Sequence, residues 1–262
     1  MSVFPWVAWY AWRRHTAYPL SAAAEALTNT VFGFIRAYVL LALWSAKPGL
    51  GGYDATDAVT FCFLTQALIG PMQVFGGLEL SARVRSGDVA IDLYRPVDLQ
   101  TWWLADDLAR ALAATLLRGV PPMLAGALFF TLTLPGPTAL AGFAAAVLLA
   151  MLVSFGIRYL VALAVFWLHD DRGLSAVSLV MSLFFSGMIL PLVAFPGWLG
   201  TLAQTLPWSA LIQVPADIFL GKSTGSELLS ALAFQATWAV VLLAAGRALT
   251  LAARRRLVIQ GG

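Results

Sequence analysis

Long apolar runs alternate with short polar segments along most of the chain. A helix needs about 20 apolar residues to cross about 30 Å of hydrocarbon, and six runs reach that length. These runs occupy residues 20–44, 58–80, 111–134, 140–167, 174–193 and 228–251. They are continuous rather than alternating, which favours helices over the strands of a transmembrane barrel. The pattern therefore predicts an all-α integral membrane protein with six transmembrane helices.

At the start of the chain, aromatic residues come before the first arginines. Trp6 and Trp12 precede Arg13 and Arg14. A cleaved signal peptide carries its positive charge ahead of its apolar run, so this order argues against one. Rings followed by guanidinium groups suit an amphipathic helix in the headgroup layer. The predicted organisation is an interfacial helix at residues 1–19, a six-span transmembrane domain at 20–254 and a tail at 255–262.

Two connections, residues 83–110 and 194–226, are too long to be plain loops. About thirty residues without structure would be unusual. The first connection leads into a helix-like stretch in which Asp106 can pair with Arg110 at i,i+4. The second separates its apolar residues with prolines, which predicts short helices at the membrane interface between spans five and six.

Composition and charge predict the topology. Hydrophobic residues make up 60% of the chain and charged residues 11%, which is too little polar surface for a water-soluble globule. Arginines gather before the first run, in every second connection and after the last run. The other connections hold only Lys47 and Lys222 as basic residues. By the positive-inside rule, both termini and residues 83–110 are cytoplasmic, and residues 194–226 are extracellular.

No motif in the sequence supplies chemistry. The stretch from Gly221 to Thr224, which contains Lys222, looks like the tail of a phosphate-binding loop, but Ala216 stands where that loop needs glycine. Cys62 is alone, and the histidines, His15 and His169, flank spans without a nucleophile at catalytic spacing. We therefore expect no catalytic residue, cofactor, metal or nucleic acid on this chain.

Five polar residues within the first two runs stand out. Glu25, Asn29 and Arg36 fall within about 40° of one another on a helix, and Gln66 and Gln73 share a face beside a Gly-Pro break. A charge at the membrane centre costs about 2.5 to 3.5 kcal/mol on insertion scales, so these faces should point inward. They fit either ordinary interhelical hydrogen bonding or the lining of a translocation path.

Two further arginines lie within later runs. Arg118 and Arg158 fall toward the predicted inner half of their spans. There they are expected to snorkel to headgroups or to pair with Asp107.

Two stretches carry a family resemblance. Residues 85–98 read RSGDVAIDLYRPVD, with a glycine, an acidic residue, a leucine and Arg-Pro in order. Residues 186–222 contain Ser-Gly, then Phe-Pro, Leu-Pro and a last proline before Leu-Gly. With the six-run topology, they resemble the permease subunits of ABC-2 type exporters, in particular the small viologen-exporter-like permeases.

The resemblance implies roles for both long connections. Residues 83–110 would hold the coupling helix that docks on a separate ATPase subunit, and the short extracellular helices would cap the exit path. The interface residues would be Arg83, Arg85, Gly87, Asp88, Leu93, Tyr94, Arg95 and Pro96. The extracellular gate would include Pro191, Pro196, Pro207 and Pro215.

The expected function is that of a non-catalytic permease subunit in the bacterial cytoplasmic (inner) membrane. It would export an amphipathic or cationic compound, in contact with membrane lipids. Its partners would be two copies of an ABC ATPase, which bind the ATP and Mg, and a second permease, identical or homologous. One alternative is a stand-alone ion-coupled carrier that uses the stripe of Glu25, Asn29 and Arg36. A membrane enzyme acting on lipid is a third, weaker alternative.

Overall fold

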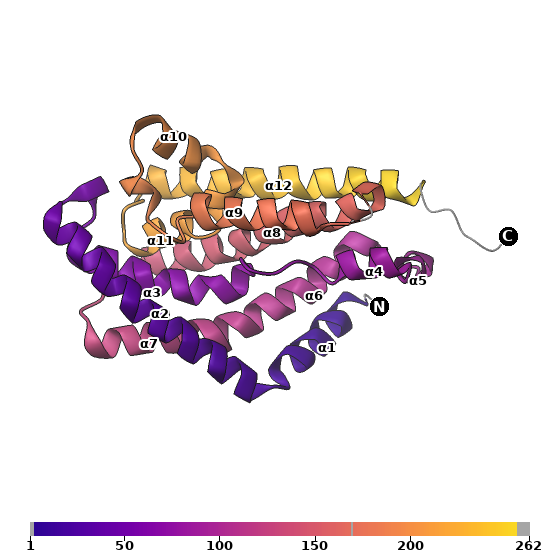
Figure 1. The fold of residues 1–262 in the computed structure, drawn as a ribbon, viewed down its shortest axis with the longest axis horizontal. Coiled ribbons are helices and arrows are strands. Elements are labelled where there is room, and N and C mark those ends of the chain that lie inside the picture. The colour runs from indigo at the N-terminus through magenta and orange to yellow at the C-terminus, as the bar shows by residue number, and fades with distance from the viewer. Residues whose placement is uncertain (1–2, 169, 256–262) are drawn as a thin grey trace.

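The computed structural model describes residues 3–168 and 170–255, and within them the chain is helical without a strand. His169 and most of the tail predicted at 255–262 lie outside the described residues. The helices form an elongated bundle whose long members run roughly side by side (Figure 1).

A helix lies at each of the six predicted positions. Four continuous helices among the described residues are long and apolar enough to cross a membrane. They are α2 (Pro19–Ala46), the run Leu99–Phe129, α8 (Pro137–Leu168) and α12 (Ser226–Arg254). At 1.5 Å per residue, α3 (Ala55–Met72) is about 27 Å long and α9 (Arg172–Phe185) about 21 Å. The six-span count therefore stays a prediction.

Both shorter helices stop before the predicted end of their apolar run. The second run extends to residue 80, but α3 ends at Met72, because the next residue, Gln73, adopts a left-handed φ of 47° that does not continue the helix. The fifth run extends to residue 193, but α9 ends at Phe185 and Gly187 has φ 87°. Residues 73–78 and 186–191 are therefore mostly irregular backbone inside apolar sequence, and we call them the two chain breaks.

The third predicted run, 111–134, begins earlier than expected. The continuous helix consists of α6 (Leu99–Ala114), a π-helical turn η2 (Thr115–Gly119) and α7 (Val120–Phe129). At Gly119 a Cβ would come within 2.7 Å of the backbone oxygen of Ala67, so only glycine allows this close approach to α3.

The two ends of the bundle carry different elements (Figure 1). The α1 end holds α1 (Phe4–Thr16), α4 (Leu80–Ser86), α5 (Val89–Tyr94) and the C-terminus of α12. The α10 end holds η1 (Leu50–Gly52), η3 (Leu192–Ala194), α10 (Gly197–Thr205), η4 (Pro207–Ala210) and α11 (Gln213–Phe219). Short helices thus occupy the segment for which the proline spacing predicts them.

The core is centred on α3 and α8. Phe61 and Phe63 of α3 and Met151 of α8 are almost completely buried. By contrast, α2 and α12 expose large apolar side chains, for example Leu27 (67% exposed) and Val240 (66% exposed). Such exposed apolar faces are expected where a protein meets lipid or another membrane subunit.

Replacing Gly187 tests the second chain break. In Gly187→Ala the new Cβ would meet Oε1 of Gln213 at 2.8 Å, on a residue with positive φ. We expect a loss of about 1–3 kcal/mol of stability, seen as a lower melting temperature of the detergent-purified protein. The control is Gly173→Ala in the first turn of α9, which meets no atom within 4 Å. Equal melting of the two variants would contradict the strain at Gly187.

Candidate functional site

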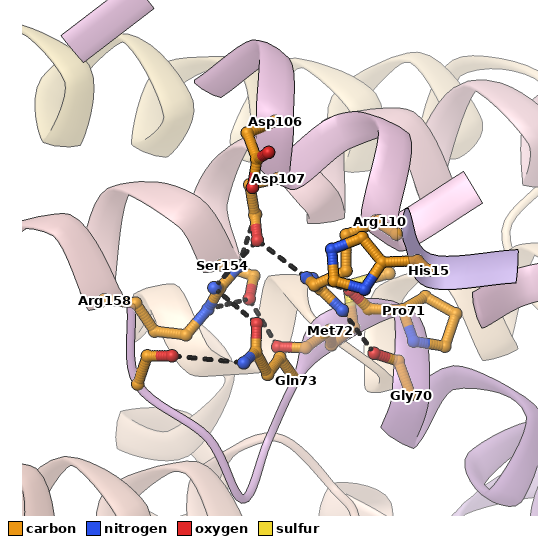
Figure 2. Close-up of polar contacts among 12 residues, drawn as sticks. His15, Gly70, Pro71, Met72, Gln73, Asp106, Asp107, Arg110, Ser154 and Arg158 are labelled. Atoms are coloured by element: carbon orange, nitrogen blue, oxygen red, sulfur yellow. Dashed lines mark hydrogen bonds and ion pairs between the residues drawn. The ribbon is translucent and has the colours of Figure 1, made fainter. Parts of the chain in front are cut away.

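Side chains from α6 and α8 bind the C-terminal carbonyls of α3 (Figure 2). A helix leaves its last four carbonyls without intrahelical partners. Arg110 donates to the carbonyls of Gly70 and Pro71, each at 3.0 Å, and Ser154 donates to that of Met72 at 2.5 Å. Three of the freed carbonyls at the first chain break are thus held by neighbouring helices.

One buried carboxylate holds the arginines in place. Asp107, whose side chain is 2% exposed, lies 2.6 Å from Nη2 of Arg158 and 2.8 Å from Nε of Arg110. Arg158 also donates to Oε1 of Gln73 at 2.9 Å and to Oγ of Ser154 at 3.2 Å. We call these five residues, Gln73, Asp107, Arg110, Ser154 and Arg158, the Asp107 cluster.

The predicted pairings of these charges are partly confirmed. Arg158 pairs with Asp107 as expected. The expected pair of Asp106 with Arg110 is wrong: Asp106 accepts from Arg14 of α1 at 3.0 Å, and Arg110 turns to Asp107. Successive helix residues point about 100° apart, so Asp106 faces α1 while Asp107 faces the core. Arg118 pairs with Glu25 of α2 at 2.6 Å rather than with Asp107.

The polar stripe of α2 lines a cavity of about 720 Å³. Glu25, Asn29 and Arg36 lie along it, and Gln66 of α3 faces the same space. Four of the five residues predicted for a path therefore share one cavity. The fifth, Gln73, does not line it and belongs to the Asp107 cluster.

Both chain breaks contribute to this cavity. Phe75 comes from the first, and Met188 and Ile189 come from the second. Arg36 donates through Nη2 to the carbonyl of Met188 and, at 3.1 Å, to that of Ile189. Irregular backbone at membrane depth is tolerated where it is buried in protein or lines a cavity, and residues of both breaks line one here.

Two smaller cavities continue around the first chain break. One of about 340 Å³ is lined by His15, Arg110 and Arg118 and shares Glu25 with the large cavity. Another of about 200 Å³ is lined by Gln73 and residues of α8 and α9. Hollow space therefore extends from the middle of α2 toward α1.

At the α1 end, α4 and α5 form a helical hairpin closed by an ion pair. Gly87 ends α4 with φ 85°, and Arg83 binds Asp92 of α5 through two contacts of 2.5 and 2.9 Å. The hydrogen bond to Asp92 and the negative charge of that carboxylate raise the pKa of Arg83. Arg85 pairs with Asp171, just before α9.

Some of the residues expected at the ATPase interface already have partners within the chain. Arg83, Arg85 and Arg95, expected to pair across an interface, all have partners within the chain, Arg95 with Asp92 and over the ring of Trp102. Leu93 is partly buried and packs against the core. Exposed residues of the hairpin include Arg85 and Arg95 themselves, the expected Gly87, Asp88, Tyr94 (72%) and Pro96, and the neighbouring Ile91 (58%).

A family model described as ABC-2 family transporter protein matches residues 28–261. The chain belongs to this family. No curated protein matches it by sequence. The resemblance carried by residues 85–98 and 186–222 is therefore confirmed for the family, and the subfamily stays a prediction. Members of the family are multi-pass membrane components of transporters that associate with an ABC ATPase and generally have no catalytic site.

At the α10 end of this ABC-2 permease, a polar network ties the short helices to α3. Lys222 pairs with Asp57 at 2.5 Å and donates to the carbonyl of Gly52 at 3.0 Å. Gln213 donates to the hydroxyl of Tyr53 at 3.0 Å, and that hydroxyl donates to Asp217. Burial raises the pKa of Asp217 and, together with Asp217, that of Tyr53.

The prolines predicted for a gate lie beside this network. Pro191, Pro207 and Pro215 are buried, and the exposed Pro196 immediately precedes α10. The sequence reasoning missed Asp57, Gln213 and Asp217. Asp57 has a local partner in Asp54, and Gln213 pairs with Asp217 four positions on. The contacts that tie them together across the bundle, to Lys222 and to Tyr53, join residues far apart in the chain, so no local pattern could have found the network.

The permease should depend more on Asp107 than on its neighbour. Asp107→Asn would leave two buried guanidinium groups without their carboxylate, and we expect a loss of about 3 kcal/mol or more. Asp106→Asn loses only the partly exposed pair with Arg14, which should cost about 1 kcal/mol or less. Unfolding in mixed micelles compares the two variants. Similar losses would show that the buried cluster is not the stronger constraint.

Stability should also change with pH through His15. Burial and the neighbouring Arg14 lower the pKa of His15 below its ordinary 6.5. The folded state therefore binds fewer protons than the unfolded state, and stability should fall as the pH drops below 6.5. Melting curves between pH 7.5 and about 5 should show this fall in the wild type and a smaller fall in His15→Gln. An unchanged slope in the variant would exclude His15 as the source.

Proposed function

We propose that this ABC-2 permease is the six-span subunit of an ATP-driven exporter of an amphipathic compound. The α1 end would face the cytoplasm of a bacterium, with both termini there, and the α10 end would face outward. Two copies of the ATPase would bind ATP and Mg, and a second permease, identical or homologous, would complete the transporter. The observation that carries the proposal is the cavity bounded by both chain breaks, beside the cluster that joins α3, α6 and α8.

The α4–α5 hairpin is the best candidate for the ATPase contact. The ion pair of Arg83 with Asp92 braces it internally, and that of Arg85 with Asp171 ties it to the start of α9, which suits an element that must transmit movement. Its exposed Ile91 and Tyr94 lie three positions apart on one helix, and aromatic side chains are frequent anchors of interfaces. Asp88, Gly87 and Pro96 would form the rim of this contact.

The exposed apolar face of α2 supports a second permease beside the cavity. Phe32, Ile35 and Val39 are all more than half exposed on this helix, and Phe32 and Val39 also line the cavity. A second copy packed here would enclose the space from the open side. The prolines at the α10 end, with the short helices that they bound, would then close the exit.

The cavity suits an amphipathic substrate better than a simple cation. Its apolar lining includes Phe32, Leu40 and Ile69. Its one carboxylate, Glu25, is already paired with Arg118. The stand-alone ion-coupled carrier remains the rival, because Glu25, Asn29 and Arg36 do share one cavity.

Co-purification with the ATPase tests the proposal. In the double variant Ile91→Ala, Tyr94→Ala, the ATPase should dissociate at least about tenfold more readily, since anchors of this kind contribute about 2 kcal/mol or more. The control is Trp198→Ala, which removes a 77% exposed aromatic side chain at the opposite end.

Transport distinguishes the two functions directly. Export from vesicles should require ATP and the ATPase subunit, and it should persist when ion gradients are collapsed. Export by the permease alone, driven by an ion gradient, would refute the proposal in favour of the carrier.

A further inference from the structure

Arg36 has an unused hydrogen-bonding group at the wall of the cavity. Its Nη2 donates to the carbonyls of Met188 and Ile189. Its Nη1 is buried and has no partner among the described residues. A guanidinium group carries five N–H donors, and a buried donor without an acceptor costs free energy. The carbonyls of the second chain break therefore accept from only some of the N–H donors of Arg36.

Arg36 also has no acidic partner within the described part of the chain. Backbone carbonyls are its acceptors, and no carboxylate lies within ion-pair distance. The only other charged residue that lines the cavity is Glu25, eleven positions earlier and so about 16 Å away along α2. Glu25 is already neutralised by Arg118 at 2.6 Å. The middle of the cavity consequently carries one uncompensated positive charge.

The other residues that line the cavity indicate the remaining chemical properties of the ligand. Phe32, Val39, Ile69 and Phe75 provide apolar surface, while Asn29 and Gln66 provide neutral hydrogen-bonding groups. The volume of about 720 Å³ lies within the range of about 300–1,000 Å³ that is usual for small-molecule sites. An acidic group at Arg36 would satisfy the free N–H, and an apolar body would fill the rest.

We propose that this cavity binds an amphipathic anion, with its carboxylate, phosphate or sulfonate group on Nη1 of Arg36. The sign of this charge is opposite to that of the cationic compounds implied by the family resemblance. The inference rests on the proposed function only for what is exported. The binding itself requires neither ATP nor the ATPase. The same chemistry could come from a free single-chain amphiphile or from an anionic lipid headgroup.

Binding can be measured by native mass spectrometry of the purified permease released from a neutral maltoside detergent. Dodecyl phosphate and dodecyltrimethylammonium share one chain and differ in the sign of the headgroup. We expect the anion to bind at least about tenfold more tightly, the difference typical of a charge-assisted hydrogen bond. Phosphatidylglycerol, compared with phosphatidylcholine, tests the lipid source in the same way.

Variants locate the anion at Arg36. Arg36→Gln should lose about tenfold in affinity for dodecyl phosphate, and Arg36→Lys should keep most of it. The control is Arg172→Gln, which removes an 89% exposed arginine that does not line the cavity. Melting temperatures of all variants show whether each remains folded. A folded Lys variant with wild-type affinity, beside a weakened Gln variant, separates loss of charge from loss of structure.

The outcomes separate this inference from the proposed function. Tighter binding of the cation, or equal binding of dodecyl phosphate by folded Arg36→Gln and wild type, overturns the anion site whatever the ATPase does. Anion binding that depends on Arg36, in a protein that exports without ATP, supports the site and refutes the proposed mechanism. Binding of phosphatidylglycerol but not dodecyl phosphate supports the site with a lipid as its occupant.

Discussion

The buried ion pair between Asp107 and Arg158 is the constraint on which the arrangement of the bundle depends. Moving a charge into a membrane interior is costly, so each of these side chains is tolerable only because the other is present. The pair fixes α6 against α8 at one depth. Arg110 binds the same carboxylate and also donates to two backbone carbonyls at the end of α3, so the ion pair is linked to a third helix. Three helices thus share one electrostatic centre.

The interruption of α3 becomes possible because of this centre. The left-handed conformation of Gln73 ends the helix inside apolar sequence, where free carbonyls would have no water to bind. Guanidinium groups suit this place well, because the C-terminal end of a helix carries a partial negative charge. The second interruption is solved in the same way, with Arg36 at the carbonyls of Met188 and Ile189. At each of the two chain breaks, an arginine therefore binds the free backbone carbonyls, and residues of both breaks line the cavity.

The sequence predicts the positions of the helices and the polar face of α2 that lines the cavity. It does not predict every contact between helices, and the reasons are physical. Apolar length places six helices, and a period of 3.6 residues places Glu25, Asn29 and Arg36 on one side of α2. The pair of Arg158 with Asp107 is predictable because an arginine within an apolar run needs an acidic partner, and Asp107 lies just before the start of a neighbouring run. The partner of Glu25 is not predictable, since it depends on how closely α2 approaches Arg118 across the bundle.

The way in which α9 is attached has a mechanical consequence. Among its own residues only Ser182 is buried, so most of the surface of this helix is not covered by the rest of the bundle. It is anchored just before its start by the bond of Asp171 to Arg85 of the hairpin, and just past its end through the carbonyls that bind Arg36. Along its length it packs more loosely, with Leu183 against the core. If the hairpin moved, α9 would connect that movement over about 21 Å to the cavity wall at Arg36.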